Sequence, residues 1–196
     1  TEDFLSIRDY TASATGDTAA AAVQQVAIKE GDIDGFLEGT WSLTVNSKAW
    51  DTNWLNVYDP TVSGDGACVA AGVRTGPFAY TVAVDGRPWS KTFGCMWAPV
   101  FRNKSHSVLL PVMDGAWTVA QDGEFLWSGR YIQLWQIVTS PDGTRVAAVV
   151  APTFGRWTIA VDDKPWSNTW GDSVMTPHFC PRGERVAAIV KEKNRW

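Results

Sequence analysis

Short apolar runs alternate with polar turns along the chain, and one arrangement of them recurs roughly every 40 residues. The clearest copy is YTVAVDGRPW (80–89). The others are WSLTVNSKAW (41–50), WTVAQDGEFLW (117–127) and WTIAVDDKPW (157–166), and Trp196 stands where a fifth would begin. An Asp-Gly pair between apolar runs is a strong signal for a two-residue β-hairpin. The copies therefore predict one hairpin per repeat.

The strand after each turn is predicted to lie at a sheet edge. Pro88 and Pro165 fall in this strand, and proline cannot donate a hydrogen bond to a neighbouring strand. The third copy has one extra residue and no proline, so we expect a longer or bulged hairpin there.

A second pattern precedes each copy and supplies two further strands. It reads DPTVSGDGACVAAGV (59–73), IVTSPDGTRVAAVV (137–150) and HFCPRGERVAAIV (178–190), with an early form at TASATGDTAAAAV (11–23) and a degenerate one at PVFRNKSHSVLLPV (99–112). In SPDG the proline presets φ and the glycine accepts a positive φ, which predicts a tight turn. The run after the turn is apolar on both faces, typical of a strand buried on both sides. A buried helix is the competing interpretation, but short runs bounded by turns favour strands.

Four strands per repeat predict an all-β fold, a β-propeller of four-stranded antiparallel blades. The expected blades are about 10–50, 57–89, 97–127 and 135–166, with a partial fifth at 174–196, and they form one propeller, or part of one, across 1–196. A solenoid of helical repeats is excluded, because no repeat holds a helix-length amphipathic segment. GDIDGFLE (31–38) is expected to be the hairpin of the first blade and not a calcium loop, since it lacks the EF-hand ligand spacing. An open half-blade exposes strand edges, so we expect missing residues, the N-terminal strand or another chain to complete the ring.

The aromatic residues fall into four columns when the repeats are aligned. The columns are Trp41, Tyr80, Trp117, Trp157 and Trp196; Trp50, Trp89, Trp127 and Trp166; Trp54, Phe93, Tyr131 and Trp170; and Tyr58, Trp97, Trp135 and Val174. All twelve Trp belong to a column, and this strict period favours one structural role in every blade, the filling of the space between neighbouring blades.

The alternative is a set of exposed aromatic platforms that anchor a partner protein or stack on sugars. The second and third columns flank the turn after the outer strand, so we expect them to be partly exposed. The candidate interface or ligand-facing residues are therefore Trp50, Trp54, Trp89, Phe93, Trp127, Tyr131, Trp166 and Trp170.

Composition and charge narrow the classes of partner. Apolar residues make up 45% of the chain and charged residues 19%, as in globular proteins. The net charge is −4 and no basic run occurs, which argues against nucleic acid. Cys68, Cys95 and Cys180 are widely spaced and odd in number, which disfavours a disulfide framework and favours a reducing compartment. No apolar run is long enough for a transmembrane segment, and no signal peptide is visible.

The sequence offers little for catalysis. His178 lies near Cys180, but a metal site needs further ligands and none recur in the other repeats, and His106 falls in a polar turn. Phosphate-loop, dinucleotide, nucleophile-elbow and zinc-protease motifs are missing. Turn geometry explains the periodic aspartates, which are Asp65, Asp85, Asp122, Asp142 and Asp162. We therefore expect no catalytic, cofactor-binding or metal-binding residue, and a protein that is not an enzyme.

Two sequence motifs resemble known families. SPDGTRVAAVV and SGDGACVAAGV resemble the turn-and-strand repeat of TolB-like propellers, relatives of the WD-repeat class. Their alternation with WTIAVDDKPW-type copies is similar to the tryptophan-rich subunit of the transmembrane electron-transfer (Tmc) complexes of sulfate-reducing bacteria. The resemblance covers 10–196, and the chain departs from it at RNKSHSVLLPV (102–112) and before residue 40. It implies a cofactor-free cytoplasmic subunit, peripheral to the inner membrane, whose partners are the other protein subunits of a membrane redox complex.

Two functions remain open on the sequence. The first is a non-enzymatic scaffold that mediates protein–protein interaction, as the resemblance implies for an electron-transfer complex. The second is a carbohydrate-binding propeller lectin that uses the periodic aromatics as sugar platforms.

Overall fold

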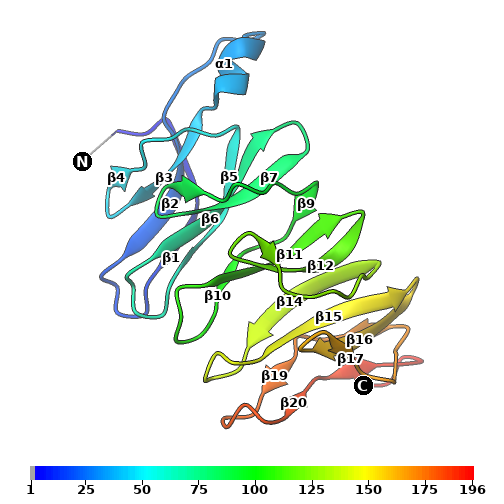
Figure 1. Ribbon diagram of the computed structural model, residues 1–196. Coiled ribbons are helices and arrows are strands. Elements are labelled where there is room, and N and C mark those ends of the chain that lie inside the picture. The colour runs from blue at the N-terminus through cyan, green and yellow to red at the C-terminus, as the bar shows by residue number, and fades with distance from the viewer. Residues whose placement is uncertain (1–2) are drawn as a thin grey trace. The chain divides into compact units, whose positions relative to one another are not determined.

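The structure, a computed structural model, describes residues 3–196, and the chain divides into two compact units (Figure 1). The first unit ends at Phe101 and the second runs from Arg102 to Trp196. Both consist of antiparallel β-sheet with almost no helix, so the predicted all-β fold class is confirmed. Within residues 3–196, no helix has the length and apolar content needed to cross a membrane.

The first unit contains two four-stranded sheets. The first sheet is β1 (Ser6–Ala12), β2 (Ala19–Gln24), β3 (Trp41–Val45) and β4 (Lys48–Ala49), hydrogen-bonded in that order. The second is β5 (Asn56–Val62), β6 (Val69–Gly76), β7 (Ala79–Val84) and β8 (Arg87–Pro88), again in that order. The short strands β9 (Cys95–Met96) and β10 (Val100–Phe101) end the unit. Each sheet is an up-and-down meander, the predicted topology of a propeller blade.

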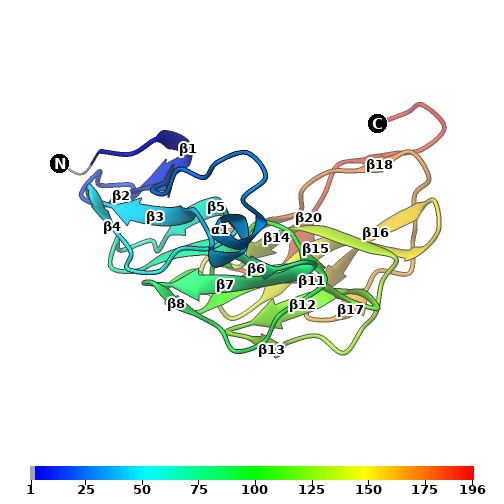
Figure 2. The same cartoon turned by 90° about the horizontal axis from the view of Figure 1, so that it is seen from above.

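The second unit repeats this design. β11 (Val108–Asp114), β12 (Ala116–Gln121) and β13 (Glu124–Phe125) are consecutive antiparallel neighbours. β14 (Gln133–Thr139), β15 (Val146–Thr153), β16 (Arg156–Val161) and β17 (Lys164–Pro165) form a four-stranded sheet. Two strand pairs follow: β18 (Ser173–Val174) with β21 (Val190–Lys191), and β19 (His178–Phe179) with β20 (Val186–Ala187). Figure 2 shows the last segment running back beside β18. The grouping of all these strands into a single propeller domain stays a prediction.

The outer strands are short and lie at sheet edges, as their prolines predicted. Pro88 is in β8 and Pro165 is in β17, each the last strand of its sheet. The bulge expected in the third copy is also present. There the Leu126 and Trp127 amides both donate to the Val119 carbonyl, at 2.9 and 3.2 Å. The extra residue is therefore absorbed within the hairpin.

The aspartates at the outer hairpins have a structural role. Asp85 and Asp162 occupy the first turn position with φ near +50°, which the short Asp side chain tolerates. Each carboxylate also accepts the first backbone N–H of the second strand in its sheet. These pairs are Asp85 with Val69, Asp122 with Val108 and Asp162 with Val146, at 2.9, 2.8 and 2.9 Å. The aspartates thus close the hairpin end of these three sheets, and Asn46 does the same in the first sheet by accepting the Ala19 amide at 2.8 Å.

One local prediction is wrong. GDIDGFLE, expected as a hairpin, contains the short helix α1 (Ile33–Glu38), which lies in the long connection between β2 and β3 (Figure 1). Asp32 caps the helix, because its side chain accepts the Gly35 amide at 2.9 Å. The hairpin of this sheet falls later, at Asn46 and Ser47, where both φ values are positive. The Asp-x-Asp-Gly motif at residues 32–35 therefore begins a helix and does not form a turn between strands.

A shared core joins the two sheets of the first unit. Leu43 and Ala22 of the first sheet pack with Val57 and Val73 of the second, and all four are fully buried. Trp54 belongs to the same cluster. The burial of apolar side chains such as these is the main stabilising contribution to folding. The packing role predicted for the aromatic columns is thus confirmed for Trp54.

Candidate functional site

The third aromatic column is buried. In every repeat the chain returns from the outer strand and its third-column residue bonds the first-column residue, as in Trp41 with Trp54, where both backbone N–H···O bonds form at 3.0 and 2.7 Å. Trp54 is 4% exposed, and Phe93 and Tyr131 are equally hidden. The expectation of partial exposure is wrong for these three residues, because the backbone bonds hold them against the core of their sheet.

The second column lies on top of the third. Trp50 and Trp54 meet edge to face with ring centroids 5.9 Å apart, and Trp127 with Tyr131 and Trp166 with Trp170 repeat this arrangement. Such pairs contribute about 0.5–1.5 kcal/mol beyond their area. The second-column residues differ in exposure: Trp127 is buried, whereas Trp50 is half-buried.

Exposure therefore separates the eight candidate aromatics. Trp50, Trp89, Trp166 and Trp170 keep exposed area. The other four are buried: Trp54, Phe93, Trp127 and Tyr131. The interface role of the eight residues stays a prediction, and direct contact with a ligand is open to the first four alone.

Asp163 binds the segment that follows Trp127. It is the second residue of the β16–β17 turn, and its carboxylate accepts the Ser128 amide at 2.8 Å, the Ser128 hydroxyl at 2.8 Å and the Gly129 amide at 3.0 Å. A Cβ at Gly129 would clash with the carboxylate, so only glycine allows this approach. The turn of one sheet thereby seals the segment that follows the outer strand of the previous sheet.

The seal also changes the chemistry of Tyr131. Burial, together with the nearby Asp163 carboxylate, raises the pKa of the Tyr131 hydroxyl to about 12. Both causes oppose the charged phenolate. Tyr131 is therefore a neutral hydrogen-bonding group at neutral pH, a packing residue and not an acid or base.

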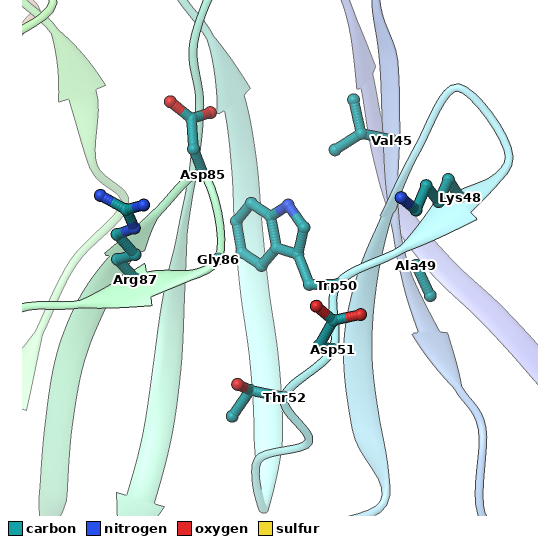
Figure 3. A pocket seen from close by; sticks show the side chains of 9 residues that line it. All are labelled: Val45, Lys48, Ala49, Trp50, Asp51, Thr52, Asp85, Gly86 and Arg87. Atoms are coloured by element: carbon teal, nitrogen blue, oxygen red, sulfur yellow. The ribbon is translucent and has the colours of Figure 1, made fainter.

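The equivalent position next to Trp50 is open (Figure 3). Here the residue in the place of Asp163 is Gly86, with φ +79°, and a Cβ built on it would lie 3.4 Å from the indole Cγ. An open cavity of about 430 Å³ borders the indole. Its lining residues are Val45, Lys48, Ala49, Trp50, Asp51, Thr52, Asp85, Gly86 and Arg87. Figure 3 shows the indole between the Asp85–Arg87 turn and the side chains of Val45 and Lys48.

Buried hydrogen bonds fix the backbone of this cavity. The Ser42 hydroxyl, fully buried, lies 3.0 and 2.9 Å from the carbonyl oxygens of Trp50 and Thr52, and these two acceptors share its single proton. Thr81 plays the same part in the second sheet, with a 2.7 Å bond to the Lys91 carbonyl. A site whose backbone is held in this way loses little conformational freedom when a ligand binds.

A related cavity of about 440 Å³ lies beside Trp166 in the second unit. Val161, Lys164, Pro165 and Trp166 line it, in the repeat positions of Val45, Lys48, Ala49 and Trp50. Arg145 and Arg185 also line it, and Arg145 forms a salt bridge with Asp162 at 2.8 Å. The second-column tryptophan therefore lines a cavity in both units.

Two connections at one end of the first unit carry exposed apolar side chains. Ile33 and Leu37 of α1 are 69% and 48% exposed, and Phe78 in the β6–β7 turn is 82% exposed. Both segments connect the second strand of a sheet to its third, so they lie at the same end of neighbouring sheets. Phe36 is also exposed and lines a hollow next to α1. Clustered exposed apolar residues are a common mark of interaction surfaces.

The histidine and cysteine side chains do not form a metal-binding cluster in the part of the chain that the structure describes. His178 is exposed in β19, and the Cys180 thiol accepts the Arg185 amide at 3.3 Å, which lowers its pKa. Within residues 3–196, no three His, Cys, Asp or Glu side chains gather closely enough to hold a metal ion. Sequence reasoning also missed Gly86, Lys48 and Arg87. One sequence signal could have indicated them: at the same turn position, one repeat has Gly86 where another has Asp163.

Comparison with known proteins points to the propeller fold. No protein family and no curated protein sequence matches the chain. Among solved structures, the chain is similar to TolB from Acinetobacter baumannii, with 12% identity, a TM-score of 0.53, and 92% of this chain and 48% of that chain covered. Putative TolB from Agrobacterium tumefaciens has 16% identity and a TM-score of 0.53, with 97% of this chain and 78% of that chain covered. A β-propeller domain from Myceliophteria thermophila has 12% identity and a TM-score of 0.54, with 96% of this chain and 65% of that chain covered.

These similarities confirm the β-propeller architecture of TolB and WD type that the repeats predicted. The chain spans about half the length of the first of these TolB structures. At such low identity the likeness concerns the fold alone, and function has to be argued from the surfaces of this chain.

Proposed function

We propose that this chain is a non-enzymatic docking propeller, a cofactor-free subunit that holds other proteins in a membrane-associated electron-transfer complex. The observation that carries the proposal is the group of exposed apolar side chains at one end of the first unit, Ile33, Phe36, Leu37 and Phe78. Phenylalanine is enriched at protein interfaces, and patches of exposed apolar side chains mark surfaces where other proteins bind.

Two further features support it. The polar side chains that recur in the repeat form hydrogen bonds with the backbone. The turn aspartates accept strand amides, and the Ser42 and Thr81 hydroxyls donate to backbone carbonyls. The resemblance of the repeat to a component of redox complexes supports the electron-transfer setting and a place on the cytoplasmic side of the membrane. The protein then contributes binding surface and not redox chemistry.

The proposal is tested by isolating the tagged full chain from detergent-solubilised membranes of a sulfate-reducing bacterium and measuring the haem and iron that remain bound. We expect the wild-type chain to retain haem-containing partners. The double substitution Phe36→Ser and Phe78→Ser should weaken the interaction about 30-fold or more and lower the retained haem accordingly, since each large apolar anchor contributes roughly 1–2 kcal/mol.

The matched control is Tyr10→Ser. Tyr10 is 87% exposed but lies near the β1–β2 turn, at the opposite end of its sheet, so its loss should leave haem retention unchanged. Equal retention by the double variant would contradict the docking role. A visible absorbance band carried by the purified chain alone would contradict the cofactor-free part.

A second candidate function, carbohydrate binding, is favoured by one specific observation. The Trp50 cavity combines a half-buried indole with hydrogen-bond donors and acceptors, the combination that sugar-binding sites use.

A further inference from the structure

Two turns in equivalent places differ by one side chain. Gly86 and Asp163 are both the second residue of the turn before the outer strand, with φ of +79° and +65°. Each lies against the segment that follows the outer strand of the previous sheet, Gly86 against Trp50 and Asp163 against Ser128 and Gly129. The two turns are therefore placed alike, and they differ in the side chain that each presents to the segment of the previous sheet.

The tryptophans that precede these two segments differ in exposure. Trp127, beside the Asp163 seal, is 3% exposed. Trp50, beside Gly86, borders a cavity of about 430 Å³, within the range of small-molecule sites. Because glycine contributes no side chain, the indole of Trp50 remains accessible from the cavity.

The charged groups around Trp50 balance one another. Lys48 and Arg87 supply donors, and Asp51 and Asp85 supply carboxylate acceptors. Asp85 already accepts the Val69 amide through one oxygen at 2.9 Å, which fixes its position. A charged ligand would meet a like charge on one side, whereas neutral hydroxyl groups can donate to the carboxylates and accept from the cations.

We propose that the Trp50 cavity binds one ring of a neutral carbohydrate, an inference that rests on the second candidate function above. The apolar face of the sugar ring packs on the indole, since a large aromatic face is the main apolar surface in the cavity. Its hydroxyl groups bond the carboxylates of Asp51 and Asp85 and the cationic groups of Lys48 and Arg87. Ser42 holds the Trp50–Thr52 backbone in place for this contact.

The Trp166 cavity is the weaker relative of this site. It keeps the lysine and the tryptophan, as Lys164 and Trp166, but Ser167 stands in the place of Asp51. Asp162 also forms a salt bridge with Arg145, whereas Asp85, its counterpart in the Trp50 site, has the Cys68 side chain as a hydrogen-bond partner. We expect this site to bind the same sugars more weakly than the Trp50 site.

The test uses the full chain and the methyl glycosides of glucose, galactose, mannose and N-acetylglucosamine, titrated by calorimetry with Trp fluorescence as a second readout. At least one sugar should bind saturably with Kd of about 1 mM. Gly86→Asn should weaken that binding about 10-fold, because its side chain would occupy part of the cavity beside the Trp50 indole, where a Cβ alone would already lie 3.4 Å from Cγ. Asparagine tolerates positive φ and adds no charge beside Asp51.

The matched control is Gly115→Asn. Gly115 also has positive φ, +71°, and a Cβ there would meet nothing within 4 Å, so sugar affinity should be unchanged. The reciprocal change Asp163→Gly should uncover Trp127 and add a second, weak binding event. Thermal unfolding of each variant shows that it is folded.

Three results would overturn the inference: no saturable binding of any of the four glycosides up to about 20 mM, unchanged affinity in Gly86→Asn, or tighter binding of sulfated or carboxylated sugars than of neutral ones. The docking role fails separately. Gly86→Asn should still retain haem-containing partners, and the Phe36 and Phe78 double variant should still bind the sugar.

Discussion

The first and second sheets place equivalent residues in opposite environments. Ile7 in β1 pairs with Val23, and Val57 in β5 pairs with Val73, so Ile7 and Val57 hold the same register position. Ile7 is 62% exposed, whereas Val57 is completely buried. The difference lies in the neighbour, because the first sheet covers Val57 and Ile7 faces solvent.

The contrast extends across the whole face. Ala19 is exposed where Val69 is buried, and Thr44 stands where the second sheet has Ala83. Phe4, Ile7 and Tyr10 line an apolar hollow of about 430 Å³ on this side. The face has the small apolar character of an inter-sheet contact, so burial in such a fold is decided by the adjacent sheet and not by the local pattern.

The largest expected effect comes from truncating the matched pair. Val57→Ala should lower the free energy of unfolding by about 2 kcal/mol, since it removes buried methyl groups and leaves a cavity. Ile7→Ala should change it by less than about 0.5 kcal/mol, because most of its side chain is already in water. Urea unfolding at fixed protein concentration measures both. Equal losses in the two variants would show that the β1 face is covered in solution.

Exchange of Thr44 and Ala83 tests the same faces in the opposite sense. Ala83→Thr should destabilise by about 2 kcal/mol, because it adds volume and a hydroxyl to a completely buried position. Thr44→Ala should stabilise by about 1 kcal/mol, since among the described residues the buried Thr44 Oγ1 has no hydrogen-bond partner. Thermal unfolding of both variants decides this. Destabilisation by Thr44→Ala would mean that a partner holds this hydroxyl.

Strand order and edges could be predicted from the sequence because they depend on local signals. Pro88 and Pro165 mark edge strands, and the extra residue before Trp127 marks a bulge. These follow from backbone chemistry alone. Helix α1 could not be predicted in this way, because a residue pattern such as Asp-Ile-Asp-Gly occurs both at strand turns and at helix starts. In the structure Asp32 caps a helix.

The site depended on contacts between sheets and was less accessible to sequence reasoning. The periodic tryptophans predicted packing, but the burial of Trp54 follows from a backbone pair with Trp41 that no local pattern shows. The open cavity at Trp50 depends on Gly86, a residue that reads as an ordinary turn glycine until it is compared with Asp163.

A smaller effect on stability is expected from Arg8. The second sheet has an aromatic pair, Tyr58 with Tyr80, where the first sheet has Arg8 with Trp41. Arg8 holds the position of Tyr58, and its guanidinium lies 3.9 Å from the Trp41 ring centroid. It also donates to the Val57 carbonyl at 3.2 Å. Arg8→Gln should cost about 1 kcal/mol by loss of the cation–π contact. Arg8→Lys, which keeps the charge, should recover part of this in the same urea assay, and no recovery would assign the loss to the hydrogen bond.

The smallest effect concerns two aspartates at the matching bulges. Asp9 and Asp59 both have φ near +45°, and burial, followed by the Asp9 charge, raises the pKa of Asp59 above its ordinary value. The folded state therefore binds this proton more tightly than the unfolded state. Stability should fall as pH rises from the ordinary carboxyl pKa through the raised one, and should then stay level.

Substitution isolates this contribution. Asp59→Asn should be more stable than wild type above the raised pKa, and the gain should disappear below the ordinary carboxyl pKa. Asp9→Asn should lower the pKa of Asp59, which NMR titration of the side-chain carboxyl carbon measures directly. If Asp59 instead titrates below its ordinary range, the two bulges do not bring these charges together, and the packing of the first sheet against the second differs at that point.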